Sequence, residues 1–426
     1  MSTLSSTGMQ KSSLLPGAEP AMQRKLLTLL VIAVFINYID RGNLSVSAAK
    51  ITDELRLNPS QMGQLSSAFF WTYALCQIPA GWLIQRYDVH KVFAAGFLLW
   101  SLATAFTGLA NSYVTLFGFR LLLGVGESVA YPAFSKIIAK DFPENQRGKA
   151  NGFIDAGSKL GPALGTLIGG LVVAKFGWRV LFLVLGFGAL AWLPFWLKSA
   201  PKEHSIENPK PLPLAEPTAL DLLSRRAVWG TFLGLFALNY AWYFMVNWFP
   251  YYLEKQRGFS TEKMAVMGAL PFAMIAISAT VGGWLSDRLI AKGHTPTLVR
   301  KSFIITGMLA ATIIYPAGIA SNDDVSMGLF LLACLVFGFA SSNHWAVTQT
   351  LAGPGAASKW TGFQNCFGNF AGVLAGWLTG EIVQRTKSFD GAFLAVACMA
   401  VLGVLSYAFI VPELKPIDWN EGRLQK

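Results

Sequence analysis

The chain alternates long apolar stretches with short polar segments along nearly its whole length. Each apolar stretch is long enough to form a helix across about 30 Å of hydrocarbon, which takes roughly 20 residues. This pattern predicts an all-α membrane protein with twelve transmembrane helices, near residues 25–49, 61–84, 92–110, 113–138, 150–174, 179–198, 227–252, 264–286, 302–320, 326–349, 361–382 and 391–412.

One polar stretch is much longer than the others and divides six predicted helices from six. Residues 198–226, KSAPKEHSIENPKPLPLAEPTALDLLSRR, are rich in proline and charge, as linkers often are. We therefore expect two six-helix bundles joined by a linker. The predicted parts are a tail at 1–24, a bundle at 25–198, the linker at 199–226, a bundle at 227–412 and a tail at 413–426.

The two halves resemble each other. AGWLIQR at 80–86 is echoed by GGWLSDR at 282–288, and glycines recur every four residues in the fifth and the eleventh predicted helices. Both echoes relate a helix to the one six places later in the same orientation, which indicates a parallel duplication. Small residues at that spacing let helices pack closely. The glycines are Gly157, Gly161, Gly165, Gly169, Gly368, Gly372, Gly376 and Gly380.

Composition and charge agree with a membrane protein. The 426 residues are 53% hydrophobic and only 13% charged, against about 25% charged in soluble chains. The net charge of +11 is typical of nucleic-acid binding, but the lysines and arginines concentrate in the tails and the even-numbered loops. By the positive-inside rule this distribution predicts cytoplasmic termini and a lipid bilayer, not a nucleic acid, as the partner.

Motifs for enzymatic or metal chemistry are absent from the sequence. The cysteines lie inside apolar stretches without CxxC spacing, and the GVGESVA segment follows no strand, so it does not indicate a nucleotide loop. We expect neither an enzyme nor a cofactor, with protons as the only coupling ion, and we assign the cysteines no function. They are Cys76, Cys334, Cys366 and Cys398.

Six ionisable residues fall inside predicted helices of the first half, and their charges sum to zero. Such residues are costly in hydrocarbon, usually face a bundle interior or water and pair with one another, so they are functional candidates. Arg120 and Glu127 share one helix face about two turns apart, whereas adjacent Asp40 and Arg41 point about 100° apart. The six are Asp40, Arg41, Arg120, Glu127, Asp155 and Lys159.

The arginines suggest how an anion would be bound. A guanidinium offers a planar fork that matches a carboxylate, so we predict that Arg41 binds a substrate carboxylate, while Arg120 either shares that task or serves as a counter-ion of the acids. Asp155 and Lys159 are spaced for an intrahelical pair. Self-neutralisation of that pair and direct contact with substrate are both open for Lys159.

Polar side chains surround these charges. Tyr38 shares a helix face with Arg41, and Tyr73 lies one turn before Gln77. The second half carries amides in place of charges, which either tie helices together or bind a hydroxylated ligand. We expect His344, beside Trp345, to be a hydrogen-bonded structural residue outside the proton path. The best amide candidates are Asn239, Asn365 and Asn369.

The chain resembles the major facilitator superfamily. The twelve predicted helices in two halves, the long central loop and the repeated G-W-L-x-x-R turns carry this resemblance. NYIDRGNLSV, SAFFWTYALCQIPAGWL, the R-x-x-x-G-x-x-E-x-x-x-x-P run from Arg120 to Pro132, and DFPENQRGKANGF resemble its anion:cation symporter branch, which includes bacterial sugar-acid/proton symporters, sialin and the vesicular glutamate transporters. In one departure, Gln85 stands where the superfamily usually has Asp, although Asp287 fills the matching place in the second half.

This resemblance implies roles for particular residues. It implies that Asp40 and Glu127 take up protons, that Arg41 binds the substrate, and that Tyr38 and Tyr73 line the substrate cavity. Ser158 lies near a place where sugar-acid symporters often have Gln, so this position bears on substrate identity.

Together these observations predict a proton-coupled transporter, a monomer in the bacterial inner membrane, that imports a small organic anion by alternating access. A sugar acid (aldonate, uronate or aldarate) is the favoured substrate. Aromatic or dicarboxylic acids, a passive anion channel and a membrane receptor are the alternatives.

Overall fold

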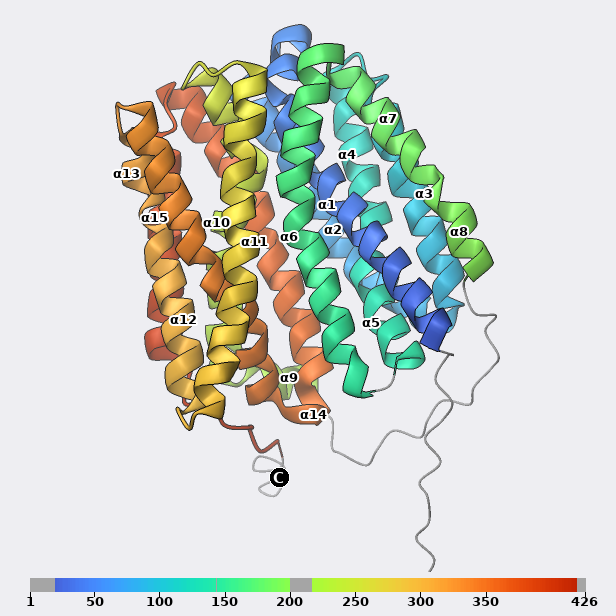
Figure 1. Cartoon of the computed structure of the whole chain (residues 1–426), viewed down its shortest axis with the longest axis vertical. Coiled ribbons are helices and arrows are strands. Elements are labelled where there is room, and N and C mark those ends of the chain that lie inside the picture. Colours follow the sequence, from blue (N-terminus) through green and yellow to red (C-terminus); the bar gives the residue numbers. More distant parts are fainter. Residues whose placement is uncertain (1–19, 143, 200–216, 420–426) are drawn as a thin grey trace, which may run out of the picture.

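The computed structural model describes residues 20–142, 144–199 and 217–419 and is helical throughout, without strands in those ranges. Figure 1 shows the helices running nearly parallel to one another. Their bounds are α1 Pro20–Leu55, α2 Pro59–Arg86, α3 Val89–Thr107, α4 Tyr113–Glu127, α5 Ala130–Asp141, α6 Glu144–Phe176, α7 Trp178–Leu190, α8 Trp192–Ser199, α9 Ala219–Leu223, α10 Arg226–Lys255, α11 Thr261–Ala291, α12 Pro296–Ala311, α13 Ile314–Ile319, α14 Asp323–Thr386, α15 Asp390–Leu405 and a terminal π-helix Ser406–Ile410.

These helices combine into the twelve predicted membrane crossings. The pairs α4/α5, α7/α8 and α12/α13 each form one crossing, as does α15 with the π-helix, while α14 contains two. The break in α14 is at Gly353, whose φ of 65° lies in the left-handed region that favours glycine. That residue separates the crossing Asp323–Gly353 from the crossing Lys359–Thr386.

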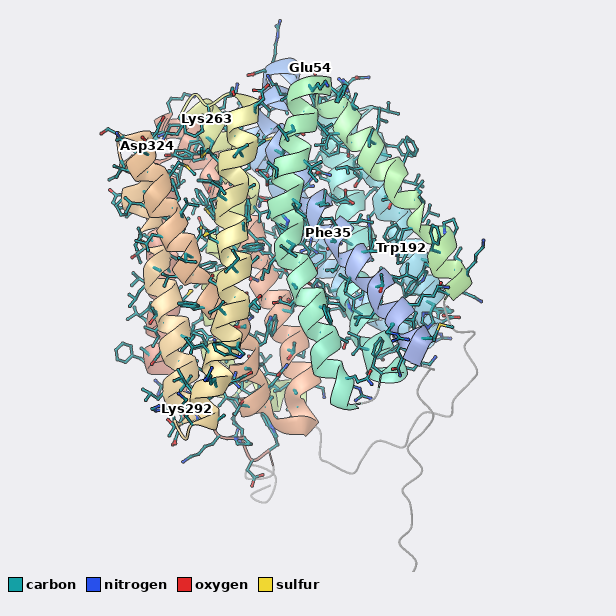
Figure 2. The ribbon with its side chains drawn as sticks, in the orientation of Figure 1. Phe35, Glu54, Trp192, Lys263, Lys292 and Asp324 are labelled. Atoms are coloured by element: carbon teal, nitrogen blue, oxygen red, sulfur yellow. The ribbon has the colours of Figure 1, made fainter. Side chains whose placement is uncertain are left out.

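Among the described residues, ten crossings are both long and apolar enough to span a bilayer. The other two are α2 and α10, and α10 is buried along most of its length. Charged side chains gather at the two ends of the molecule, as Glu54, Lys263 and Asp324 do at one end and Lys292 at the other (Figure 2). Exposed apolar side chains between the ends, such as Ile78 and Val184, fit a surface in contact with lipid.

The crossings form two bundles of six. Within the first bundle α1 packs on α6, α2 on α4 and α3 on both α4 and α7, and within the second α14 packs on α10, α11 and α12. The bundles meet where α2 contacts α14, α6 contacts α11 and α1 contacts α10. We call the end where α1 begins the terminal end; the segment after the π-helix lies there too (Figure 1). The opposite end is called the far end.

At the far end the bundles are in close contact through glycines. A Cβ built on Gly63 of α2 would lie 2.6 Å from the carbonyl oxygen of Gly376 in α14, and one on Gly170 of α6 would lie 2.5 Å from the Cβ of Ala265 in α11. The predicted close packing of the eleventh helix is therefore found, with α2 as its partner. Ser60 also donates a hydrogen bond to Glu381 across the same contact.

Toward the terminal end this contact stops. A hydrogen bond between the bundles joins Asn365 of α14 to Gln77 of α2 at 3.3 Å. One turn further toward the terminal end, Gly81 and Gly362 follow on the same helix faces, and a Cβ built on either would have nothing within 4 Å. The helices α2 and α14 are thus in contact from Gln77 and Asn365 to the far end and separate at Gly81 and Gly362.

Candidate functional site

A buried ion pair lies at the centre of the first bundle. Nε of Arg41 on α1 donates to Oε2 of Glu127 on α4 at 2.8 Å, and the two side chains are 4% and 0% exposed. Gly124 brings α4 close to α2, since a Cβ there would lie 2.3 Å from the carbonyl oxygen of Phe69. Removing one partner of such a pair leaves an uncompensated buried charge at a cost of about 3–5 kcal/mol.

Aromatic rings enclose the guanidinium. The Cζ atom of Arg41 lies 4.5 Å from the ring centre of Tyr73, 4.7 Å from that of Tyr38 and 5.3 Å from that of Phe69. The hydroxyl of Tyr38 is hydrogen-bonded to that of Tyr131 at 3.1 Å. Nη2 of Arg41 has no hydrogen-bond partner among the described residues, so the fork keeps a free donor toward an incoming anion.

The carboxylate of Asp40 contacts other residues than the Arg41–Glu127 pair. Its Oδ1 accepts a hydrogen bond from Asn43 at 3.2 Å, and its carboxylate lies beside Thr104 on α3. The side chain is 1% exposed. Asp40 and Arg41 thus contact different helices, as their angular separation predicts.

Arg120 does not pair directly with Glu127. Its Nε donates to the carbonyl oxygen of Leu65 at 3.3 Å, and its guanidinium lies over the ring of Phe69. It is near enough to Asp40 and Glu127 to act on both electrostatically. Of the two predicted roles, this position fits the counter-ion better than direct contact with substrate.

On α6 the Asp155–Lys159 ion pair, one of the two alternatives left open for these residues, is not formed. Asp155 is exposed, and no ion pair between described residues includes either side chain. The ammonium of Lys159 instead lies 4.8 Å from the ring centre of Trp242 on α10. Ser158 is buried and its hydroxyl donates to the carbonyl oxygen of Asp155 at 2.7 Å, so in this conformation it is satisfied within its own helix.

The three predicted amides of the second bundle join helices. Asn239 donates to the carbonyl oxygen of Gly368 at 3.0 Å, and Asn365 donates to Gln77 across the bundles. Asn369 accepts a hydrogen bond from the Tyr243 hydroxyl at 2.7 Å. Tyr243 in turn packs against Phe70 of α2 at 4.3 Å between ring centres, so this network lies against the first bundle.

His344 is a buried residue with a local hydrogen bond. The imidazole is 3% exposed and is hydrogen-bonded to the backbone of Ser341 and Ala340. Its ring also packs on that of Trp345, with 4.5 Å between centres.

Sequence reasoning also missed residues around the charged cluster. Asn37 is completely buried on α1, with its side-chain amide beside the carboxylate of Glu127. It precedes Arg41 by four residues, a spacing that could have identified it. Tyr131 and Trp242 were missed because their partners are distant in sequence.

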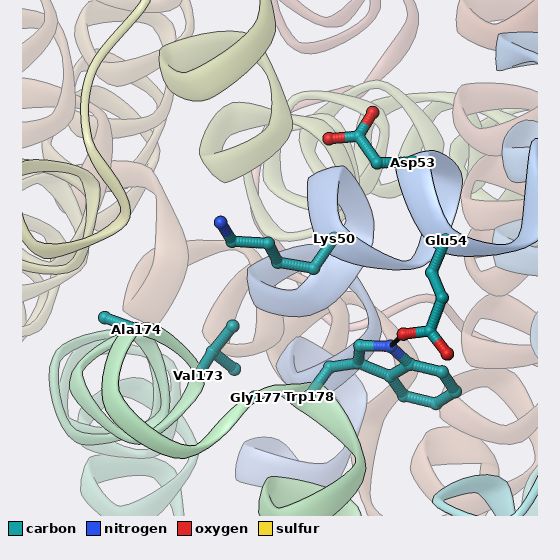
Figure 3. A pocket seen from close by; sticks show the side chains of 7 residues that line it. All are labelled: Lys50, Asp53, Glu54, Val173, Ala174, Gly177 and Trp178. Atoms are coloured by element: carbon teal, nitrogen blue, oxygen red, sulfur yellow. Dashed lines mark hydrogen bonds between the residues drawn. The ribbon is translucent and has the colours of Figure 1, made fainter.

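Two open cavities of about 520 Å³ each lie away from this cluster. One is at the far end between α1, α6 and α7, where the indole of Trp178 donates to Glu54 at 2.7 Å and Lys50 also lines the cavity (Figure 3). The other lies on α12 in the second bundle. Neither is lined by Arg41 or Glu127, whose side chains are 4% and 0% exposed. No group of metal-ligating side chains occurs among the described residues.

Comparison with known proteins gives a consistent result. The family model described as Major Facilitator Superfamily matches residues 30–376. The D-galactonate transporter of Escherichia coli O6:H1 is 30% identical, over 94% of this chain and 98% of its own. A protein of E. coli K12 named "Probable galactarate/D-glucarate transporter GarP" is 29% identical, over 92% and 95%.

A solved structure shares the fold. It is a bacterial homologue of the human lysosomal transporter Spinster, in an inward-facing and occupied conformation, with a TM-score of 0.73 and 20% identity. The match covers 93% of this chain and 96% of that one.

Proposed function

The chain belongs to the major facilitator superfamily, and from this premise we propose that it is a secondary transporter that couples a small organic anion to protons. The favoured substrate is a sugar acid. The relatives named for D-galactonate and for galactarate and D-glucarate support this class, because each aligns over more than nine tenths of both chains.

The observation that carries the proposal is the enclosed Arg41–Glu127 pair. Glu127 occupies one side of the guanidinium while Nη2 stays unpartnered. A substrate carboxylate that binds this fork bidentately would compete with Glu127. A buried carboxylate that loses its cation partner binds a proton more readily. Substrate binding at Arg41 and proton binding at Glu127 would then favour each other.

Asp40 provides a second proton site in this scheme. Asp40 is buried, and the charges of Glu127 and Arg120 both act on its carboxylate. Importing a monoanion into a negative-inside cell costs about 2.3 kcal/mol per 100 mV, which one proton cancels and two reverse. Two buried acids allow either stoichiometry.

The two bundles would expose the site alternately by rocking about it. We propose a monomer in the bacterial inner membrane with both tails in the cytoplasm, which makes the terminal end the cytoplasmic one. The close glycine contacts at the far end, and the separation of α2 from α14 at the terminal end, then correspond to an inward-facing arrangement.

Uptake into proteoliposomes tests the proposal. Purified protein should accumulate labelled galactonate or galactarate above the outside concentration only with an inward proton gradient. A passive channel would equilibrate the acid without regard to that gradient. Preference for neutral sugars over their acids would overturn the role of Arg41.

A further inference from the structure

Lys159 is a half-buried cation that forms no ion pair with an acid among the described residues. Its ammonium contacts the face of Trp242 across the bundle interface, and no ion pair among the described residues includes it. A lone charge in the membrane interior is costly unless something pairs with it. A cation–π contact gives only about 0.5–2 kcal/mol, so the ammonium keeps most of its capacity to bind an anion.

A second polar group lies near this ammonium. The charge of Lys159 acts electrostatically on the imidazole of His344 on α14, which is 3% exposed and hydrogen-bonded to the backbone of Ser341 and Ala340. A neutral imidazole has one N–H donor and one acceptor nitrogen. With its N–H bound to the backbone, His344 keeps an acceptor for a substrate hydroxyl next to an acid group at Lys159.

The charge balance of the site also calls for a second negative charge. Asp40, Arg41, Arg120 and Glu127 are neutral together when both acids are ionised, and Asp155 is exposed outside this cluster. Lys159 therefore leaves one excess positive charge. Loading one proton onto an acid raises the excess to two, which a dianion would neutralise and a monoanion would not.

Consecutive residues of α10 lie near the two cationic groups, Lys159 and Arg41. Trp242 contacts Lys159, and the next residue, Tyr243, packs on Phe70 and is within electrostatic range of Arg41. Consecutive side chains of a helix point about 100° apart, so the two positive groups lie on different sides of this helix segment.

We propose that Lys159, His344 and Trp242 form a second anion subsite, and that the preferred substrate is a dianion with one acid group at Arg41 and the other at Lys159. A hydroxylated dicarboxylate of the aldarate type meets this requirement. The inference rests on the proposed function, since it assumes that Arg41 holds the first carboxylate.

The test compares two six-carbon acids that differ at one terminal carbon, galactarate and galactonate, in proteoliposome uptake. Wild-type protein should have the lower KM for galactarate. Lys159→Gln should raise the KM for galactarate about tenfold or more, because the loss of a charge-assisted hydrogen bond has an effect of this size. The KM for galactonate should change little. Lys159→Arg should retain much of the preference, and His344→Gln should weaken it to a smaller extent.

Lys175→Gln is the matched control, because Lys175 is an exposed lysine on the same helix that also lies over an aromatic ring, that of Phe176. It should leave both KM values unchanged. Competition of unlabelled galactarate and galactonate for uptake by wild-type protein gives the same preference without any variant, in case Lys159→Gln fails to fold.

Equal effects of Lys159→Gln on both acids, or a wild-type preference for galactonate, would overturn the second subsite while leaving the proposed function intact. Failure of wild-type protein to transport either acid would instead remove the proposed function, and the subsite with it.

Discussion

The two bundles share one architecture but differ in chemistry at the membrane centre. The first carries the enclosed pair of Arg41 with Glu127 and the buried Asp40, whereas the corresponding region of the second carries amides such as Asn239 and Asn369. Amides keep the same charge at every pH, while carboxylates titrate. The difference suggests that proton chemistry belongs to the first bundle and recognition of substrate hydroxyls to the second.

Of the variants that test this division, Glu127→Gln should have the largest effect on proton-driven uptake. The amide keeps the shape of the side chain but cannot take up a proton, so uptake driven by a proton gradient should fall about 100-fold or more, the range of a lost protonation step. The measurement is the initial rate of uptake of labelled sugar acid with and without the proton gradient.

Exchange of labelled for unlabelled acid is the control for this variant, because exchange requires binding and rocking but no net proton movement. It should persist in Glu127→Gln. If gradient-driven accumulation is normal in this variant, Glu127 is not the coupling acid.

Arg41→Lys should come next in size. Lysine keeps the positive charge but loses the planar fork that lies among Tyr38, Phe69 and Tyr73. We expect KM for the acid to rise about 10- to 100-fold, the cost of one or two charge-assisted hydrogen bonds. An unchanged KM would show that the first carboxylate binds elsewhere.

Gly376→Leu tests how the bundles meet at the far end. A Cβ there would lie 2.6 Å from the hydroxyl oxygen of Ser67, so the larger side chain should push α2 and α14 apart at a cost of about 1–3 kcal/mol. We expect slower uptake and faster hydrogen–deuterium exchange in the far-end part of α2.

Gly362→Leu on the same crossing is the matched control, since a Cβ at Gly362 meets nothing within 4 Å. Its far-end exchange should match wild type. Similar exchange in both variants would show that the far-end glycines do not set the closed contact.

Tyr243→Phe should have the smallest effect. It removes the hydroxyl that donates to Asn369 at 2.7 Å, a hydrogen bond with a net value of about 1 kcal/mol, so KM should rise roughly fivefold. Tyr240→Phe is the matched control on α10, because Tyr240 is a buried tyrosine of the same helix whose hydroxyl lies beside Thr379 instead of Asn369. Proton coupling should be normal in both variants, and its loss in Tyr243→Phe would contradict the division between bundles.

The periodic features of the chain were predictable from the sequence. The crossings follow from apolar length, and the glycines of α14 at four-residue spacing indicate a close helix contact, although not that α2 is the partner. The break at Gly353 was not needed to predict two crossings there, because a polar interruption already separates them.

Pairings across the fold were not predictable. Glu127 pairs with Arg41, 86 positions away, and not with Arg120 on its own helix, because the tertiary arrangement of the helices brings the Arg41 guanidinium of α1 to the Glu127 carboxylate of α4. Lys159 has an acid four residues away but lies on Trp242 of the other bundle. Local spacing gives the residues that can pair, while tertiary packing selects the pair.

The most direct test of the central claim is proton uptake on substrate binding by purified protein in weakly buffered detergent solution. The account predicts that adding sugar acid to wild-type protein makes the solution more alkaline, because the substrate displaces Glu127 from Arg41 and the freed carboxylate takes a proton. Glu127→Gln should bind the acid without this change. Binding without proton uptake in wild-type protein, or equal uptake in the variant, would contradict the competition between substrate and Glu127.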